Sequence, residues 1–288
     1  GSITNDELAR QRQISLPDLV KPAGDSNPQH QMASGIGLKT PLERIYLALI
    51  ERYGQDAVVQ GSLETRSTID LALQTRIAEI VQEFEVGTEV QDIALVVLDD
   101  RNQLRAAYAS QESLFERDLS DTRTVDQLMG QPIERSLFGS LDGITVLRLG
   151  ELHSILGRNG RSYDTEVLLE TRDQLGQTID LFGHHIGLKL NDESVSRMND
   201  QLSNFRFRGP HLAATNNEIE VKGNLGADSQ HQIAWFGGTS SRFTVSLWFT
   251  SQIDSLDGIK QEPQSSSSLR REAERLARWI FSAAHKYV

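Results

Sequence analysis

Lysine, serine and histidine are the side chains with which this sequence could carry out nucleophilic chemistry. The chain has 288 residues and no cysteine, which excludes disulfides, thiolate metal sites and a cysteine nucleophile. A serine three residues before a lysine on a helix places its hydroxyl beside an amine that can take its proton. The residues three positions before the lysines are Asp18, Ile36, Ile186, Ile219, Asp257 and Ala283. The sequence therefore contains no Ser-x-x-Lys pair.

Three other groupings of reactive side chains favour ordinary structural roles. Adjacent histidines on a helix point about 100° apart, so His184-His185 cannot chelate one ion together, and we expect no metal site. Asp99-Asp100 stands where a hairpin turn is expected, and aspartates are common in turns. The glycine-rich basic stretch 157–161 lacks the Lys-Ser/Thr of a phosphate loop and is interpreted as a turn. No cofactor is expected.

The composition is that of a soluble globular protein with an acidic balance. Charged residues make up 24% of the chain, hydrophobic residues 38%, and the formal net charge is −11. This charge argues against a nucleic-acid partner, which needs a basic face. No apolar run approaches the roughly 18 residues that cross a bilayer. Gly1-Ser2 resembles a cloning remnant, so any signal or membrane anchor is expected upstream of this sequence.

The elements that must position these side chains begin with residues 218–250. Short β-rich runs separated by turn residues predict an antiparallel sheet there. Within residues 243–249, alternate side chains face the core, whereas Thr244, Ser246 and Trp248 face a second covering layer. Residues 92–110 predict a further hairpin. Apolar residues at helical spacing predict helices over 40–53, 71–84 and 269–287.

The other segments have weaker patterns. Residues 1–39 are polar and are interpreted as a linker or extended arm before a domain of 40–288. Residues 57–66 are strand-like, and 145–156 form an amphipathic stretch compatible with either strand or helix. Residues 165–186 and 193–205 are predicted to be helical. In the second of these, Val195, Met198, Leu202 and Phe205 would form the apolar stripe.

A known family is recognisable in several of these segments. Residues 61–74 read Gly-Ser-Leu-Glu-Thr-Arg-Ser-Thr-Ile-Asp-Leu-Ala-Leu-Gln, and they follow a helix ending in Tyr53-Gly54. Later come Ala234-Trp235-Phe236 and Val245-Ser246-Leu247-Trp248. This text resembles the transpeptidase domain of class A penicillin-binding proteins, over residues 38–288 with a gap in the middle. The resemblance implies an α+β fold with a five-stranded antiparallel sheet flanked by helices.

The resemblance also assigns the positions at which the family's catalytic motifs would stand. The nucleophilic Ser and Lys of the family fall on Glu134 and Leu137. The Lys-Thr-Gly of its strand edge falls on Lys222-Gly223-Asn224, and its Ser-x-Asn corresponds to Thr171-Arg172-Asp173. All three motifs are therefore replaced. In the family, the helix that carries the nucleophile points its N-terminus at this strand edge, so the resemblance implies that Glu134 lies within about 10 Å of Lys222, with no substrate-sized pocket between them. A carboxylate at a helix start is favoured by the helix dipole, which makes Glu an understandable replacement for Ser.

These replacements imply a catalytically inactive transpeptidase-like domain of a bacterial cell-envelope protein. It would act in the periplasm as a structural or protein-interaction module linked to peptidoglycan synthesis or remodelling. Its expected partner is another envelope protein, and an upstream glycan-polymerising domain outside this sequence would be consistent with the resemblance. Two alternatives stay open. One is an active hydrolase or transferase with a rewired site, and the other is a sensor that binds a peptidoglycan fragment in the remnant cleft.

Overall fold

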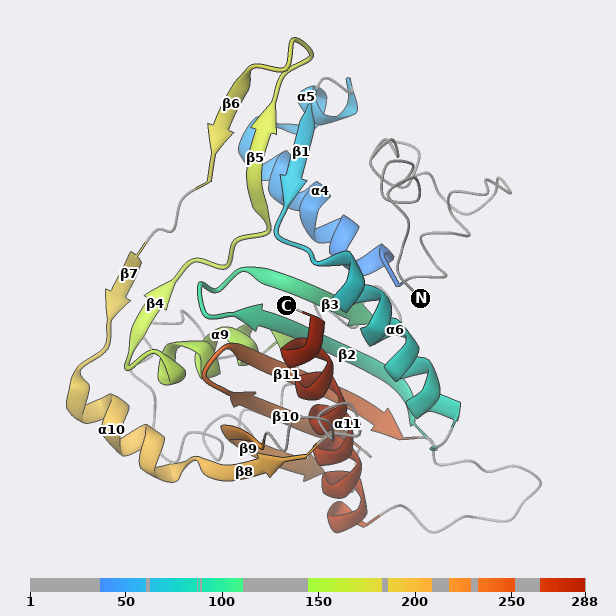
Figure 1. Ribbon diagram of the computed structural model, residues 1–288, viewed down its shortest axis with the longest axis vertical. Helices are drawn as coiled ribbons and strands as arrows, with labels where there is room; N and C mark the ends of the chain where they lie inside the picture. The colour runs from blue at the N-terminus through green and yellow to red at the C-terminus, as the bar shows by residue number, and fades with distance from the viewer. Residues whose placement is uncertain are drawn as a thin grey trace. The chain divides into compact units, whose positions relative to one another are not determined.

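The computed structural model describes residues 37–60, 63–86, 88, 90–110, 145–182, 186–208, 218–228, 233–251 and 265–287 (Figure 1). These residues form two compact units. The first contains the described residues up to Thr68 together with residues 167–182. The second contains the described residues between 69 and 166 and those from 186 onward. No helix in this described part is long and apolar enough to cross a membrane.

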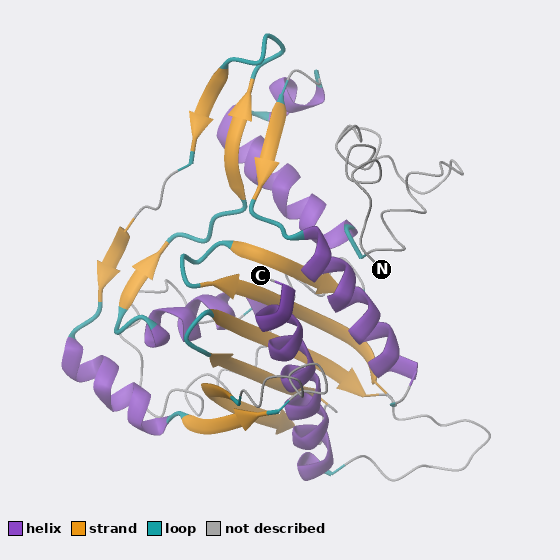
Figure 2. Cartoon of the chain, viewed as in Figure 1, coloured by secondary structure: helices purple, strands orange, loops and turns teal. Residues whose placement is uncertain are grey.

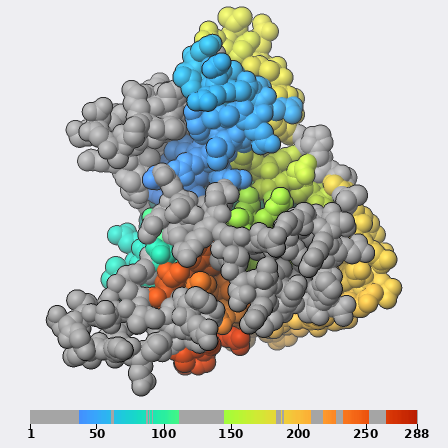
Figure 3. All heavy atoms as spheres, turned by 180° about the vertical axis from the view of Figure 1, so that it is seen from behind, coloured from blue at the N-terminus to red at the C-terminus, as the bar shows by residue number. Residues whose placement is uncertain are grey.

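The first unit joins two helices to a small antiparallel sheet. Its elements are α4 (Lys39–Tyr53), α5 (Gln55–Val59), β1 (Glu64–Ser67), β5 (Leu168–Arg172) and β6 (Thr178–Leu181). The strands lie in the order β1-β5-β6, and Thr65 of β1 pairs with Thr171 of β5. Figure 3 shows residues of this N-terminal part, in blue, packed against the yellow hairpin, although the two lie far apart in sequence. Tyr53 links helix to sheet by donating a hydrogen bond of 2.9 Å to Asp180.

Two sequence predictions in the first unit were wrong. The predicted helix over 165–186 was wrong, because β5 and β6 form a hairpin over residues 168–181. Its turn is fixed by Asp173 Oδ1, which accepts hydrogen bonds from the Leu175 and Gln177 amides, and by Gly176 at φ +76°. Residues 57–66 begin in helix α5, and only their last part joins a strand, β1.

The second unit is built on a six-stranded antiparallel sheet. The strands are β2 (Val90–Asp99), β3 (Leu104–Ala109), β8 (Ser203–Phe207), β9 (Ile219–Asp228), β10 (Ile233–Thr239) and β11 (Phe243–Ser251). Their order is β3-β2-β11-β10-β9-β8. The α+β class with an antiparallel sheet flanked by helices is confirmed, but the sheet has six strands rather than five.

Helices cover both faces of this sheet (Figure 2). On one face, α6 (Leu71–Val86) and α11 (Ser266–Tyr287) pack on the core side chains of β2 and β11, which include Phe243, Val245, Leu247 and Phe249. On the other face lies α9 (Val146–Gly157), whose Val146 carbonyl accepts a 2.6 Å hydrogen bond from Ser246. Trp248 is buried as expected, at 1% exposure. The side chains of β11 therefore alternate between the two faces of the six-stranded sheet, as the sequence predicted.

The remaining described elements are β4 (Arg161–Tyr163), β7 (Ile186–Lys189) and α10 (Asp192–Gln201), and β4 pairs with β7. The stretch 145–156, for which the sequence left strand and helix open, is helix α9 from Val146 onward. The Thr145 side chain caps this helix by accepting a hydrogen bond from the Arg148 amide. The predicted helix over 193–205 was wrong at its end. Helix α10 stops at Gln201, and Leu202 turns the backbone to an extended conformation that enters β8.

Candidate functional site

The positions that the resemblance assigned to catalysis are divided among different parts of the chain. Lys222, Gly223 and Asn224 lie in β9 of the second unit. Thr171 and Asp173 lie in the β5–β6 hairpin of the first unit, where Thr171 is buried and pairs across the sheet with Thr65. Residues 134 and 137 lie outside the described residues. The predicted approach of Glu134 to Lys222 therefore stays a prediction.

Strand β9 does not form the edge of the sheet. Its outer side pairs with β8 over five residue pairs, among them Asn204 with Lys222 and Arg206 with Glu220. The expectation that Lys222 stands on a strand edge was therefore wrong. The reason lies in Phe205 and Phe207, which alternate in β8 and join an aromatic cluster with Phe236 and Phe281. Burial of Phe207, which is 1% exposed, ties the added strand to the core.

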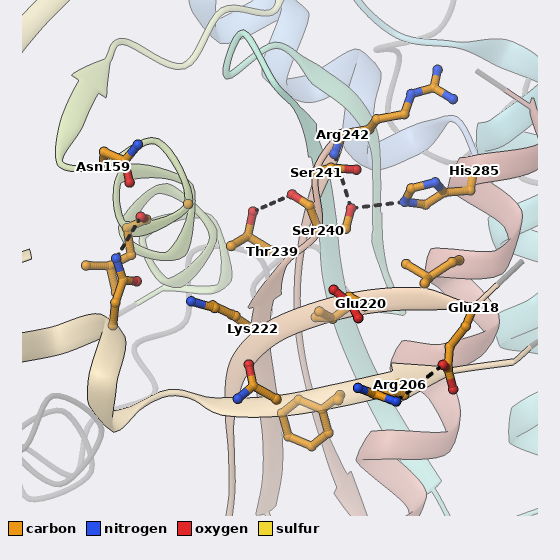
Figure 4. A pocket seen from close by; sticks show the side chains of 17 residues that line it. Asn159, Arg206, Glu218, Glu220, Lys222, Thr239, Ser240, Ser241, Arg242 and His285 are labelled. Atoms are coloured by element: carbon orange, nitrogen blue, oxygen red, sulfur yellow. Dashed lines mark hydrogen bonds and ion pairs between the residues drawn. The ribbon is translucent and has the colours of Figure 1, made fainter. Parts of the chain in front are cut away.

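A cavity of about 930 Å³ opens beside Lys222, on the face of the sheet that carries α9 (Figure 4). Its walls come from the face of β8 and β9, the C-terminal end of α9, the turn between β10 and β11, and the end of α11. The polar residues that line it include Asn159, Asn199, Asn204, Arg206, Glu218, Glu220, Lys222, Thr239, Ser240, Ser241, Arg242 and His285. Thr171 is not among the lining residues.

Charged side chains on β9 alternate in sign along one face of this cavity. Lys222 and Glu220 are separated by one residue, so both project from the same side of the strand, as Figure 4 shows. Both side chains are exposed, and within the described part of the chain neither makes a hydrogen bond or ion pair. By contrast, Glu218 contacts Arg206 at 3.8 Å and Arg208 at 3.3 Å. The cavity thus presents an exposed anion and an exposed cation side by side on β9, with Arg206 of β8 directly opposite Glu220.

Ser240 and His285 form the nearest approach to a nucleophile and base at this cavity. Ser240 Oγ lies 3.0 Å from His285 Nε2 (Figure 4). Burial, assisted by Arg242, lowers the pKa of His285 to about 4, so the imidazole is neutral at pH 7 and can accept a proton. However, Ser240 Oγ also accepts hydrogen bonds from the amides of Phe243 and Arg242. These hydrogen bonds hold the Ser240 hydroxyl within the turn between β10 and β11. They also withdraw electron density from its oxygen, which makes the oxygen a weaker nucleophile.

Sequence reasoning missed Glu220, Ser240 and His285. No local motif marks them, because Ser240 stands in a turn and His285 near the end of the last helix. One signal was available for Glu220, since alternation along β9 places it on the same face as Lys222. The chemistry at this cavity is that of polar recognition by amides, hydroxyls and charges. Among the described residues, no group of three or more His, Cys, Asp or Glu side chains could hold a metal ion.

The signature that carried the resemblance has a structural role in the second unit. Asp70 Oδ1 accepts a 3.0 Å hydrogen bond from the Leu73 amide at the start of α6, and Asp70 Oδ2 lies 3.3 Å from Arg105 Nη2. Gln74, which is fully buried, donates to the Ala107 carbonyl at 2.8 Å and accepts from the Ala107 amide at 2.9 Å. These contacts attach α6 to β3, the strand at one edge of the six-stranded sheet.

Comparison with known proteins gives matches of structure but not of sequence. No family model and no curated protein matches the sequence. Among solved structures, penicillin-binding protein PonA1 from Mycobacterium tuberculosis has a TM-score of 0.62 at 12% identity, over 85% of this chain and 90% of that chain. This is the fold of penicillin-binding transpeptidase domains. PonA1 in complex with penicillin V gives 0.60 at 12% identity, over 88% of this chain and 93% of that chain.

A second transpeptidase-like structure agrees with this assignment of fold. PBPA from Mycobacterium tuberculosis has a TM-score of 0.50 at 9% identity, and the match covers 77% of this chain and 82% of that chain. Identities this low establish a common fold and nothing about activity. The transpeptidase-like fold is thus kept by a chain whose sequence has no Ser-x-x-Lys pair.

Proposed function

We propose that this chain is a non-catalytic transpeptidase-like module of a bacterial cell-envelope protein. It acts as a structural or protein-interaction domain linked to peptidoglycan synthesis or remodelling. The observation that carries this proposal is the combination of a transpeptidase-like fold with a sequence that has no Ser-x-x-Lys pair. Acyl transfer in this fold needs a hydroxyl activated by a nearby amine, and no serine precedes a lysine at that spacing.

The proposed location follows from the same likeness of fold. A module of this kind works outside the cytoplasm, in the periplasm or an equivalent space, and is held there by a segment upstream of this sequence. The absence of cysteine agrees with an oxidising compartment, in which a free thiol is reactive. Its partner is then another envelope protein. A pulldown from envelope extract, with the purified chain as bait, identifies that partner.

A second function is favoured by one observation, the cavity beside Lys222. A space of about 930 Å³, lined by amides, hydroxyls and exposed charges of both signs, fits a binding site for a polar ligand better than a filled remnant. In this second candidate function the module is a sensor that binds a peptidoglycan fragment. It requires no chemistry from Ser240 or His285.

The test of the inactive state is covalent labelling with a fluorescent penicillin. We expect no label that survives denaturation, because acylation needs an activated serine. An active penicillin-binding protein, labelled under the same conditions, is the positive control. A stable adduct that maps to any serine would overturn the proposal. If it maps to Ser240 and disappears in Ser240→Ala and His285→Gln, the chain is an enzyme with a rewired site.

A further inference from the structure

Exposed large apolar side chains gather in the first unit. In the described part of that unit they are Leu47, Val59, Leu175, Ile179 and Leu181. The described part of the larger second unit has Val86 and Tyr287. Ile179 and Leu181 both belong to β6, and Leu181 is 75% exposed. Apolar side chains that gather at a surface mark an interaction site, so β6 is the candidate for one.

The outer side of β6 pairs with no strand among the described residues. Strand β5 lies between β1 and β6, so β6 forms an edge of the small sheet (Figure 1). The Phe182 amide donates a hydrogen bond to the Leu169 carbonyl of β5. Because backbone groups alternate in direction along a strand, the N–H and C=O of Leu181 point away from β5. An extended chain can bind these groups by adding a fourth strand to the sheet.

Arg52 of α4 places an exposed cation beside this edge. Its Nε and Nη2 donate hydrogen bonds to Asp180 of β6 at 3.2 and 3.4 Å. The Arg52 side chain is 57% exposed, whereas that of Asp180 is 26% exposed. The remaining nitrogen, Nη1, makes no hydrogen bond within the described part of the chain, so it can donate to a second carboxylate.

The two faces of β6 therefore offer different chemistry to an added strand. Asp180 and Leu181 are successive residues, so their side chains lie on opposite faces of the sheet. One face presents the exposed guanidinium of Arg52, and the other presents the apolar side chain of Leu181. A strand in which acidic and apolar residues alternate matches both faces at once.

Size and charge decide between a second copy of this chain and a different protein. Each copy has a formal net charge of −11, so two copies repel one another. Strand β6 has four residues, far fewer than the roughly 20–30 residues a side of a stable interface between folded proteins. An extended segment of another protein gains its affinity from main-chain hydrogen bonds instead.

We propose that β6 binds an extended segment of a partner protein, with alternating apolar and acidic residues, as a fourth strand of the small sheet. An apolar residue of that segment lies beside Leu181, and an acidic residue binds Arg52. This inference rests on the proposed interaction module, and it names the kind of partner segment that the module takes. It does not involve the cavity beside Lys222.

The experiment measures binding of two fluorescently labelled peptides to the full chain by fluorescence anisotropy. One peptide reads Val-Glu-Val-Glu-Val and the other Val-Lys-Val-Lys-Val. We expect the glutamate peptide to bind, and the lysine peptide to bind about fivefold more weakly or worse, the effect of losing one partly exposed ion pair. Binding should also slow amide hydrogen exchange in β6, which contact through side chains alone would not do.

Substitutions at the edge test the two parts of the proposal separately. Leu181→Gln should weaken binding of the glutamate peptide about tenfold, because the burial of one leucine is lost. Arg52→Gln should bind the two peptides equally. The matched controls are Leu175→Gln, in the turn of the same hairpin, and Arg197→Gln, an equally exposed arginine on α10 of the second unit. Both controls should bind like the wild type.

Three results would overturn the inference. They are equal binding of the two peptides to the wild type, unchanged binding in Leu181→Gln, and a wild-type dimer in sedimentation velocity that Leu181→Gln dissociates. In the last case the occupant of the edge is a second copy. If neither peptide binds, the inference is also wrong, and the pulldown from envelope extract then tests the proposed function separately. A partner recovered equally by wild type and Leu181→Gln leaves the interaction module standing, whereas recovery of no partner contradicts it too.

Discussion

At the scale of single residues, His153 on α9 is a titratable side chain enclosed between a helix and the six-stranded sheet. It is fully buried, and its Nδ1 donates a 2.9 Å hydrogen bond to the Leu149 carbonyl, since a carbonyl can only accept. Its other nitrogen, Nε2, is buried and has no hydrogen-bond partner among the described residues. A Cβ added at Gly237 of β10 would collide with the imidazole ring. The ring therefore occupies space that a glycine leaves open between helix and sheet.

This environment predicts how stability depends on pH. Burial lowers the pKa of His153 from 6.5 to about 4, so the unfolded chain binds a proton more readily than the folded chain between these values. Stability from this group is complete above pH 6.5 and is lost as the pH falls towards 4. The loss is on the order of 3 kcal/mol. About 2 kcal/mol of this loss is reached by pH 5, and urea unfolding at pH 7.5 and pH 5 measures it. His153→Gln should flatten the difference.

His285 provides the comparison for this prediction. Burial and the nearby Arg242 lower its pKa to about 4 as well, so it acts in the same pH window. His285 is only partly buried, whereas His153 is completely buried. We expect His285→Gln to reduce the pH dependence less than His153→Gln does. An unchanged slope in His153→Gln would show that another group titrates.

At the scale of elements, Gln74 joins helix α6 to the last strand of the six-stranded sheet. Its side-chain amide satisfies both the N–H and the carbonyl of Ala107 in β3. Gln74→Met keeps the volume but leaves both buried backbone groups unpaired, at a cost of about 1–3 kcal/mol each. We expect a loss of at least about 2 kcal/mol in the free energy of unfolding, measured by chemical denaturation.

The matched control for this variant is Gln82→Met, at an exposed position of the same helix. It should change stability by less than about 0.5 kcal/mol, as most surface substitutions do. Equal effects of the two substitutions would mean that the Ala107 contacts contribute nothing measurable. The signature glutamine would then lack the structural role that its hydrogen bonds indicate.

Helices and strands whose apolar residues keep one regular spacing were predictable from the sequence. Segments in which this spacing changes from helical to strand-like were not. The hairpin of β2 and β3, the strands β10 and β11 and the helices α4, α6 and α11 lie where their apolar spacing predicted. The helix predicted from the apolar stripe between Val195 and Phe205 was wrong, because helix α10 ends before Leu202 and a strand follows. Beyond that boundary the period is two, with Phe205 and Phe207 on one face. The turn at Asp173 and Gly176 was likewise a local signal that the helical interpretation overrode.

At the scale of the whole molecule, the sequence located the scaffold better than the site. Lys222 was found by its place before a recognisable strand, and it does line the cavity. Ser240, Arg242 and His285 could not be grouped with it, because only the pairing of β9 with β10 and the packing of α11 bring them together. A residue within a local sequence motif can therefore be found from the sequence. A site whose residues come from distant segments can be found only from the three-dimensional structure.

The final prediction concerns α11, which closes the core of the second unit. Its apolar stripe, with Leu276, Ile280 and Phe281 each fully buried, packs on the sheet and on α6. Deleting residues 269–288 uncovers both that stripe and the sheet face beneath it, so we expect loss of the cooperative thermal transition of this unit. Circular dichroism and differential scanning calorimetry measure it.

A single substitution tests whether the deletion acts through the buried face of α11 or only because residues are missing. Ile280→Asp places an unpaired carboxylate in the core and should abolish the same transition, because burial of a charge without a partner costs several kcal/mol. Glu274→Asp, at an exposed position on the same helix, should melt like the wild type. An unchanged melting temperature for the deletion or for Ile280→Asp would mean that α11 does not close this core. If both variants lose the transition and Glu274→Asp retains it, the last helix stabilises the sheet through its buried face.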